Sequence, residues 1–125
     1  MAAAVSPEVV MAISVLRATE SGDPLEIEDI SKLLLELEDR GFDFGEVALR
    51  RVPGGVYSED VEAFVGRLLA AGYGKARSPI EFFEDGLRIC RIILADELKD
   101  NREGLTAVAS ALNYDIFRAL PSAPR

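Results

Sequence analysis

Side chains suited to catalysis are sparse in this sequence. Its 125 residues include no histidine and one cysteine, Cys90. The lack of histidine excludes histidine-based catalytic dyads and triads, imidazole zinc sites and histidine pH sensing. Serines, tyrosines and carboxylates are present, but no spacing pairs a nucleophile with a base. We therefore expect no catalytic residues, no metal ligands and no cofactor, and we interpret the chain as a binding protein rather than an enzyme.

Cys90 could be a reactive thiol or a small apolar core residue. Its neighbours Leu87, Ile89, Ile92 and Ile93 are all apolar, which favours a buried, unreactive thiol. A single cysteine allows no intrachain disulfide.

Basic residues of the middle third could bind phosphate. Residues 1–46 hold 11 acids and 3 bases, whereas residues 47–91 hold 6 acids and 7 bases. The formal net charge of −8 argues against indiscriminate nucleic-acid binding, whose affinity comes from neutralising phosphates. It is compatible with a local basic face, for which the candidates are Arg50, Arg51, Lys75, Arg77, Arg88 and Arg91. The alternative is that these bases are scattered over a solvated surface.

Acidic side chains cluster in the segment 24–40. They are Glu28, Asp29, Glu36, Glu38 and Asp39. Such a surface could bind a metal ion or a basic partner, but no further ligand is positioned beside it, so a solvated helix face is the expected role.

Five segments carry helical sequence signals. Ser6-Pro7-Glu8 combines a cap, a proline for the first turn and an acid, and Asp23-Pro24-Leu25-Glu26 repeats this pattern. Apolar residues then recur at spacings of three and four. The expected helices lie at about 7–20, at about 24–40, from Ser58 to Gly72, from Phe83 or Glu84 onward, and at 102–113.

Short extended segments separate these helices. Residues 47–52 alternate loosely and suit a short strand, Pro53-Gly54-Gly55 breaks it, and residues 80–83 suit another strand. The helix that begins near Phe83 is apolar around much of its circumference, which predicts a central position or a place in a dimer interface.

Length and composition indicate one domain over 1–120 with a flexible tail at 121–125. Nearly half of the residues are hydrophobic, enough for a substantial core. Residues 1–5 do not form a signal peptide, and no apolar run approaches the roughly 20 residues of a membrane span. We therefore expect a soluble, cytoplasmic protein.

Two motifs carry a resemblance to a known fold. The segment Val52-Pro-Gly-Gly-Val-Tyr57-Ser58-Glu59-Asp60, followed by Leu68-Leu69-Ala-Ala-Gly72, resembles the Gly-Pro-Tyr-Ser segment of uncharacterised prokaryotic and phage-associated winged-helix proteins. Phe82-Phe83-Glu84-Asp85-Gly86-Leu87 is similar to the Leu-Thr-Glu-x-Gly segment that ends the wing of many winged-helix regulators. The resemblance covers roughly 24–100. Val56 replaces the proline of the first motif, and Phe83 replaces the capping threonine of the second.

The resemblance implies a DNA-binding surface. A recognition helix would begin at Ser58 and would carry Arg67. The wing would hold Lys75 and Arg77. Arg50 and Arg51, just before the helix, would bind phosphate. The first turn of that helix, however, holds three acids, Glu59, Asp60 and Glu62. Their alternative role is to stabilise the positive end of the helix dipole.

The predicted fold is mainly α, a winged-helix-like domain of about five helices with a small β-hairpin; the alternative is an all-α bundle. The predicted function is that of a DNA-binding transcriptional regulator of winged-helix type, with Arg50, Arg51, Ser58, Arg67, Lys75 and Arg77 at the double-stranded DNA. The alternative function is a non-enzymatic protein–protein interaction module whose acidic surface binds a basic protein. In either case we expect a homodimer, formed through the fourth and last helices, and no membrane contact.

Overall fold

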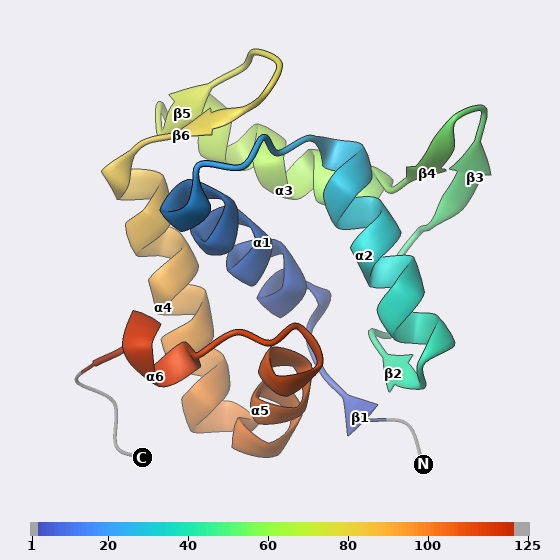
Figure 1. The fold of residues 1–125 in the computed structure, drawn as a ribbon, viewed down its shortest axis with the longest axis vertical. Helices are drawn as coiled ribbons and strands as arrows, with labels where there is room; N and C mark the ends of the chain where they lie inside the picture. The colour runs from blue at the N-terminus through green and yellow to red at the C-terminus, as the bar shows by residue number, and fades with distance from the viewer. Residues whose placement is uncertain (1–2, 122–125) are drawn as a thin grey trace.

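The computed structural model describes residues 3–121, so all but the first residue of the tail predicted at 121–125 lies outside the described residues. The helices of the described part are α1 (Pro7–Ser21), α2 (Ile27–Asp39), α3 (Glu59–Ala70), α4 (Glu84–Asp100), α5 (Arg102–Ala111) and α6 (Ile116–Ala119) (Figure 1). The strands are β1 (Ala3–Ala4), β2 (Phe42–Asp43), β3 (Arg50–Val52), β4 (Gly55–Tyr57), β5 (Gly74–Lys75) and β6 (Glu81–Phe82). The prediction of a mainly helical fold is confirmed.

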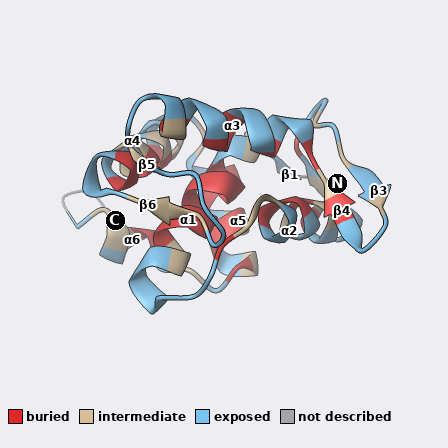
Figure 2. Cartoon of the chain, turned by 90° about the horizontal axis from the view of Figure 1, so that it is seen from above, coloured by how far each residue is buried: buried red, intermediate tan, exposed pale blue. Residues whose placement is uncertain are grey.

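Helix α1 lies at the centre of the molecule. The hydroxyl of Ser6 caps it by accepting a hydrogen bond from the backbone N–H of Glu8 at 3.3 Å, and Pro7 occupies the first turn. Every residue from 9 to 16 is buried, and the other long helices lie around α1 (Figure 1), with exposed residues on their outer faces (Figure 2). A helix that is apolar on all sides belongs at the centre of a core.

Helix α4 is peripheral, so of its two predicted places the central one is wrong, and the place in a dimer interface stays a prediction. It buries Leu87, Cys90, Leu94 and Leu98 on one face, and packs through that face on α1 and α5. Ile92, on the opposite face, is 48% exposed. The central place belongs to α1 because its buried residues surround the helix, whereas those of α4 cover one side.

Helix α2 begins at Ile27, three residues later than predicted. The backbone N–H of Glu26 donates to Asp29 Oδ2 at 2.8 Å, and this contact fixes the helix start in place of the predicted Asp23 cap. The apolar stripe is confirmed by the burial of Ile30, Leu34 and Leu37.

Two antiparallel hairpins flank α3 in the sequence. In the first, Arg50 pairs with Tyr57 and Val52 with Gly55, across a turn in which Gly54 has a φ of 91°. That left-handed conformation suits glycine after proline in a tight turn. In the second, β5 pairs with β6. A third, parallel pair joins β1 to β2.

The element order of the predicted winged helix is present, with α2, a hairpin, α3, a second hairpin and α4 in succession. The two hairpins belong to separate two-stranded sheets. The winged-helix assignment therefore stays a prediction. Over the described residues, no helix combines the length and the hydropathy needed to cross a bilayer.

Candidate interaction surface around helix α3

Ser58 positions α3 and is not part of its exposed surface. The residue is fully buried, and its hydroxyl accepts a hydrogen bond from the backbone N–H of Val61 at 3.3 Å. A serine in this place satisfies a backbone donor that the helix itself leaves free. The interpretation of Ser58 as a nucleic-acid contact is therefore corrected: its side chain is enclosed by the protein.

The exposed face of α3 is acidic in its first turn, and further on it carries small residues and one arginine. Val61, Phe64, Val65 and Leu68 turn toward the core. The residues exposed to solvent are Glu59, Asp60, Glu62, Ala63, Gly66, Arg67 and Ala70. Arg67 is thus the one base that the described surface of this helix offers, against three acids.

Each acid of the first turn also holds the segment before α3 in place. Glu59 forms an ion pair with Arg50 at 3.5 Å, and Asp60 Oδ2 accepts a hydrogen bond from the backbone N–H of Ala48 at 2.6 Å. The hydroxyl of Tyr57 donates to Glu62. These contacts, together with the favourable position of the acids at the positive end of the helix dipole, stabilise the start of α3, while the three acidic residues stay exposed to solvent.

The two arginines of the first hairpin do not form one patch. Adjacent strand residues point to opposite faces, and Arg50 pairs across the ladder with Tyr57 whereas Arg51 pairs with Val56. The guanidinium of Arg50 lies over the Tyr57 ring at 5.2 Å from its centroid. Arg51 is exposed.

The bases of the second hairpin lie beside an acid. Lys75 is the cross-strand partner of Glu81, and Arg77 forms an ion pair with the same carboxylate. The two hairpins stand at opposite ends of α3 (Figure 1). The predicted phosphate contacts are therefore divided among the first hairpin, α3 itself and the second hairpin. Most of these basic side chains lie beside an acidic one.

The remaining two basic candidates lie on α4. Arg88 pairs with Asp85 at 3.5 Å and Arg91 with Glu84 at 2.8 Å.

An apolar groove of about 370 Å³ runs beside α3, between the start of α2 and the loop of the second hairpin. Ile27, Val65, Leu69 and Ile80 contribute apolar side chains to it, and Glu26, Glu62 and Arg77 contribute charged ones. A Cβ added to Gly66 would meet no atom within 4 Å, so the groove is open at that position.

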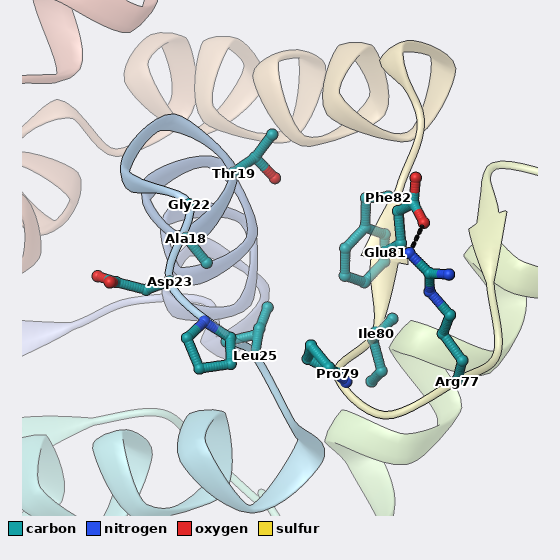
Figure 3. Close-up of a pocket in the computed structure, with 11 residues that line it drawn as sticks. Ala18, Thr19, Gly22, Asp23, Leu25, Arg77, Pro79, Ile80, Glu81 and Phe82 are labelled. Carbon is teal, nitrogen blue, oxygen red and sulfur yellow. Dashed lines mark ion pairs between the residues drawn. The ribbon is translucent and has the colours of Figure 1, made fainter.

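A second pocket, also about 370 Å³, lies on the other side of Ile80 (Figure 3). Ala18 and Leu25 face Pro79, Ile80 and Phe82 across it, and the ion pair between Arg77 and Glu81 lies at one side. The backbone N–H of Ile80 donates to the carbonyl of Leu25 at 3.0 Å, which joins the two walls. The pocket offers apolar contact.

The sequence did not reveal either pocket, because each is lined by segments far apart in the chain. The available signal for the first groove was Gly66, a small residue at an exposed position of α3 that lines it. Small side chains on a solvent-facing helix surface leave room for another molecule to approach closely.

Cys90 is buried, as predicted. Desolvation raises the pKa of its thiol to about 12, against a smaller opposing effect of the Arg91 charge. The thiol is therefore protonated at neutral pH and does not act as a nucleophile. Across residues 3–121, no three acidic, histidine or cysteine side chains gather in a way that could hold a metal ion.

Comparison with protein-family models, with curated proteins and with solved structures finds no match to this chain.

Proposed function

We propose that this chain is a protein-interaction module, and that it binds a basic, partly apolar segment of another protein at α3. The observation that carries the proposal is the composition of the exposed face of α3, with three acids, three small residues and one base beside an apolar groove.

This composition suits a protein segment better than a duplex. A recognition helix contacts DNA with the residues near its N-terminus. In α3 that end carries Glu59, Asp60 and Glu62, which would repel the phosphates, whereas affinity for DNA depends on positive charge. An apolar side chain of a protein partner would instead fill the groove over Val65 and Leu69, while lysines or arginines beside it meet the acids. Complementary charge at the rim favours the correct partner and speeds encounter.

The proposal is tested by filling the groove. Gly66→Lys places a long cation where the surface is open, and the substitution also favours the helix. The matched control is Ser110→Lys, at an exposed position of α5. The variants and the wild-type protein serve as baits in lysate from the source organism. We expect a protein captured by wild type and by Ser110→Lys to be lost with Gly66→Lys; equal capture by all three baits contradicts the proposal.

The second candidate is the winged-helix DNA-binding regulator. It is favoured by the placement of the two hairpins at opposite ends of α3, which puts the exposed bases Arg51 and Lys75 where two stretches of a duplex backbone could be contacted. Its test is the anisotropy of a labelled generic duplex. Under this candidate, alanine at Arg50, Arg51, Lys75 and Arg77 together weakens binding and flattens its salt dependence; unchanged binding rules out this face.

A further inference from the structure

We infer that the pocket beside β6 binds an extended apolar segment of another protein, which pairs with the outer edge of β6 at Phe82 and places one apolar side chain between Leu25 and Phe82. This pocket lies on the other side of Ile80 from the α3 groove. The inference therefore does not rest on the proposed function, and either one can fail while the other holds.

The register of the second hairpin turns the backbone groups of Phe82 outward. The backbone N–H of Phe83 donates to the carbonyl of Tyr73 at 2.8 Å, and Gly74 is the cross-strand partner of Phe82. Hydrogen-bonded pairs alternate with non-hydrogen-bonded pairs along an antiparallel ladder. The pair of Gly74 and Phe82 is therefore a non-hydrogen-bonded one, and the N–H and C=O groups of Phe82 point away from β5.

This outer edge of β6 already makes one strand-like contact. Ile80, two residues before Phe82, turns its N–H to the same side and donates to the carbonyl of Leu25 at 3.0 Å. In the part of the chain that the structure describes, β6 forms a sheet with β5 alone, and the backbone of Phe82 has no hydrogen-bonding partner on its outer side. An open strand edge of this kind is a template for another extended chain.

The pocket lies on the same side of β6 as this open edge. It occupies about 370 Å³ between the end of α1 and β6 (Figure 3). Its apolar walls are Ala18, Leu25, Pro79, Ile80 and Phe82. The volume is at the lower end of the range of small-ligand sites, roughly 300–1,000 Å³, so it accommodates one large apolar side chain together with the backbone that carries it.

The open edge and the pocket together select an extended peptide as the occupant. A residue of an antiparallel partner strand that lies opposite Phe82 accepts a hydrogen bond from the N–H of Phe82 and donates one to its carbonyl. The side chain of that residue lies beside the side chain of Phe82, and therefore enters the pocket. Main-chain hydrogen bonds supply affinity in such strand addition, and the pocket supplies specificity for leucine or a similar apolar residue.

The test is a titration of isotope-labelled wild-type protein, followed by NMR, with a small probe that carries these groups, N-acetyl-leucine N′-methylamide. The backbone amide signals of Leu25, Ile80 and Phe82 should shift, and that of Phe82 should move downfield because its N–H gains an acceptor. We expect saturation with a dissociation constant on the order of 1 mM, given the few atoms of the probe. The N-methyl-leucine analogue lacks the N–H that donates to Phe82 and should bind at least tenfold more weakly. The glycine analogue, which lacks the apolar side chain, should cause no saturable shift.

A pair of matched variants tests the place of binding. Thr19 is exposed and lines the pocket, so Thr19→Phe should fill it and weaken binding of the leucine probe at least tenfold, with a native-like amide spectrum. The control Thr106→Phe should bind as wild type does, because both threonine hydroxyls donate to the carbonyl four residues earlier in an exposed helical turn.

Four results would each overturn the inference. They are the absence of a saturable shift at Phe82, equal binding by Thr19→Phe and Thr106→Phe, and an N-methyl analogue as tight as its parent, which would mean apolar contact without strand pairing. The fourth is a shift of the same amides with protein concentration alone, which would mean that a second copy of the chain occupies the site.

Discussion

Two helical glycines should respond in opposite ways to the same substitution. Gly86 is buried in the first turn of α4, and a Cβ there would lie 2.8 Å from the backbone carbonyl oxygen of Tyr73 and 3.2 Å from its Cβ. Gly66 lies within α3, is exposed, and has nothing within 4 Å of such a Cβ. Alanine at Gly86 therefore meets a rigid backbone group, whereas alanine at Gly66 meets solvent.

The expected magnitudes follow from two opposing effects. Replacing glycine by alanine inside a helix stabilises it by about 1 kcal/mol, since the unfolded chain loses conformational freedom. Forcing an extra methyl group into a packed site costs about 1–3 kcal/mol. At Gly86, which lies in the first helical turn where the propensity gain is smallest, the steric cost prevails and we expect a net loss of about 1–2 kcal/mol. At Gly66 the gain stands alone, at about 0.5–1 kcal/mol.

The assay is urea unfolding of wild type, Gly86→Ala and Gly66→Ala, followed by circular dichroism, with the free energy of unfolding extrapolated to water. The control is built in, because both variants make the same chemical change in a helix. If Gly86→Ala is as stable as Gly66→Ala, the close approach of α4 to Tyr73 is wrong.

Three further results are expected. Ser58→Ala should lower the free energy of unfolding by about 1–2 kcal/mol, because it removes the buried cap of α3; no loss in urea unfolding would contradict the role assigned to Ser58. Cys90 should react with a thiol reagent at pH 8 in denatured protein but not in native protein, because burial raises the pKa of its thiol to about 12; fast native labelling would show the thiol to be accessible. The free energy of unfolding should fall as pH rises from about 9 toward 12. Desolvation chiefly raises the pKa values of Cys90 and Tyr114 to about 12 in the folded state, so the folded state keeps protons that the unfolded chain has released. The midpoint of thermal unfolding should therefore be lower at pH 10.5 than at pH 8, and equal midpoints would refute this.

Helices with strong local signals were predictable from sequence. The serine cap and Pro7 place α1 within one residue of its predicted end at about 20, and Ser58 marks the start of α3. Such signals are local, because a cap acts on the backbone within one turn. For α2 two competing starts were present, and the Glu26–Asp29 contact prevailed over Asp23-Pro24.

Features that depend on packing between distant segments were not predictable. The parallel contact of β1 with β2 joins Ala4 to Asp43, and two-residue strands carry no periodicity. The four residues of α6 are likewise too short for a helical pattern. In the sequence, Gly86 was notable only as part of the motif Phe82-Phe83-Glu84-Asp85-Gly86-Leu87. The reason that a glycine suits this position is the close approach of the Tyr73 backbone, which only the three-dimensional structure shows.

The candidate site changed most between sequence and structure. Arg50, Arg51, Arg67, Lys75 and Arg77 were grouped by their proximity along the chain to α3. The structure sets the first two on opposite faces of one hairpin and pairs Arg77 with Glu81. Side-chain direction and ion pairing, which decide whether charges add, are not contained in spacing alone.

The central claim is that α3 presents a surface for protein, and the most direct test examines one variant in two assays. Gly66→Lys adds a cation at the exposed centre of α3, so it strengthens binding to phosphates and blocks a protein that uses the groove. The account predicts that this variant loses the partner captured by wild type and Ser110→Lys, and that wild type shows no salt-sensitive duplex anisotropy even at low salt. Steeply salt-dependent duplex binding by wild type, strengthened by Gly66→Lys with protein capture unchanged, would contradict it and establish the DNA-binding candidate.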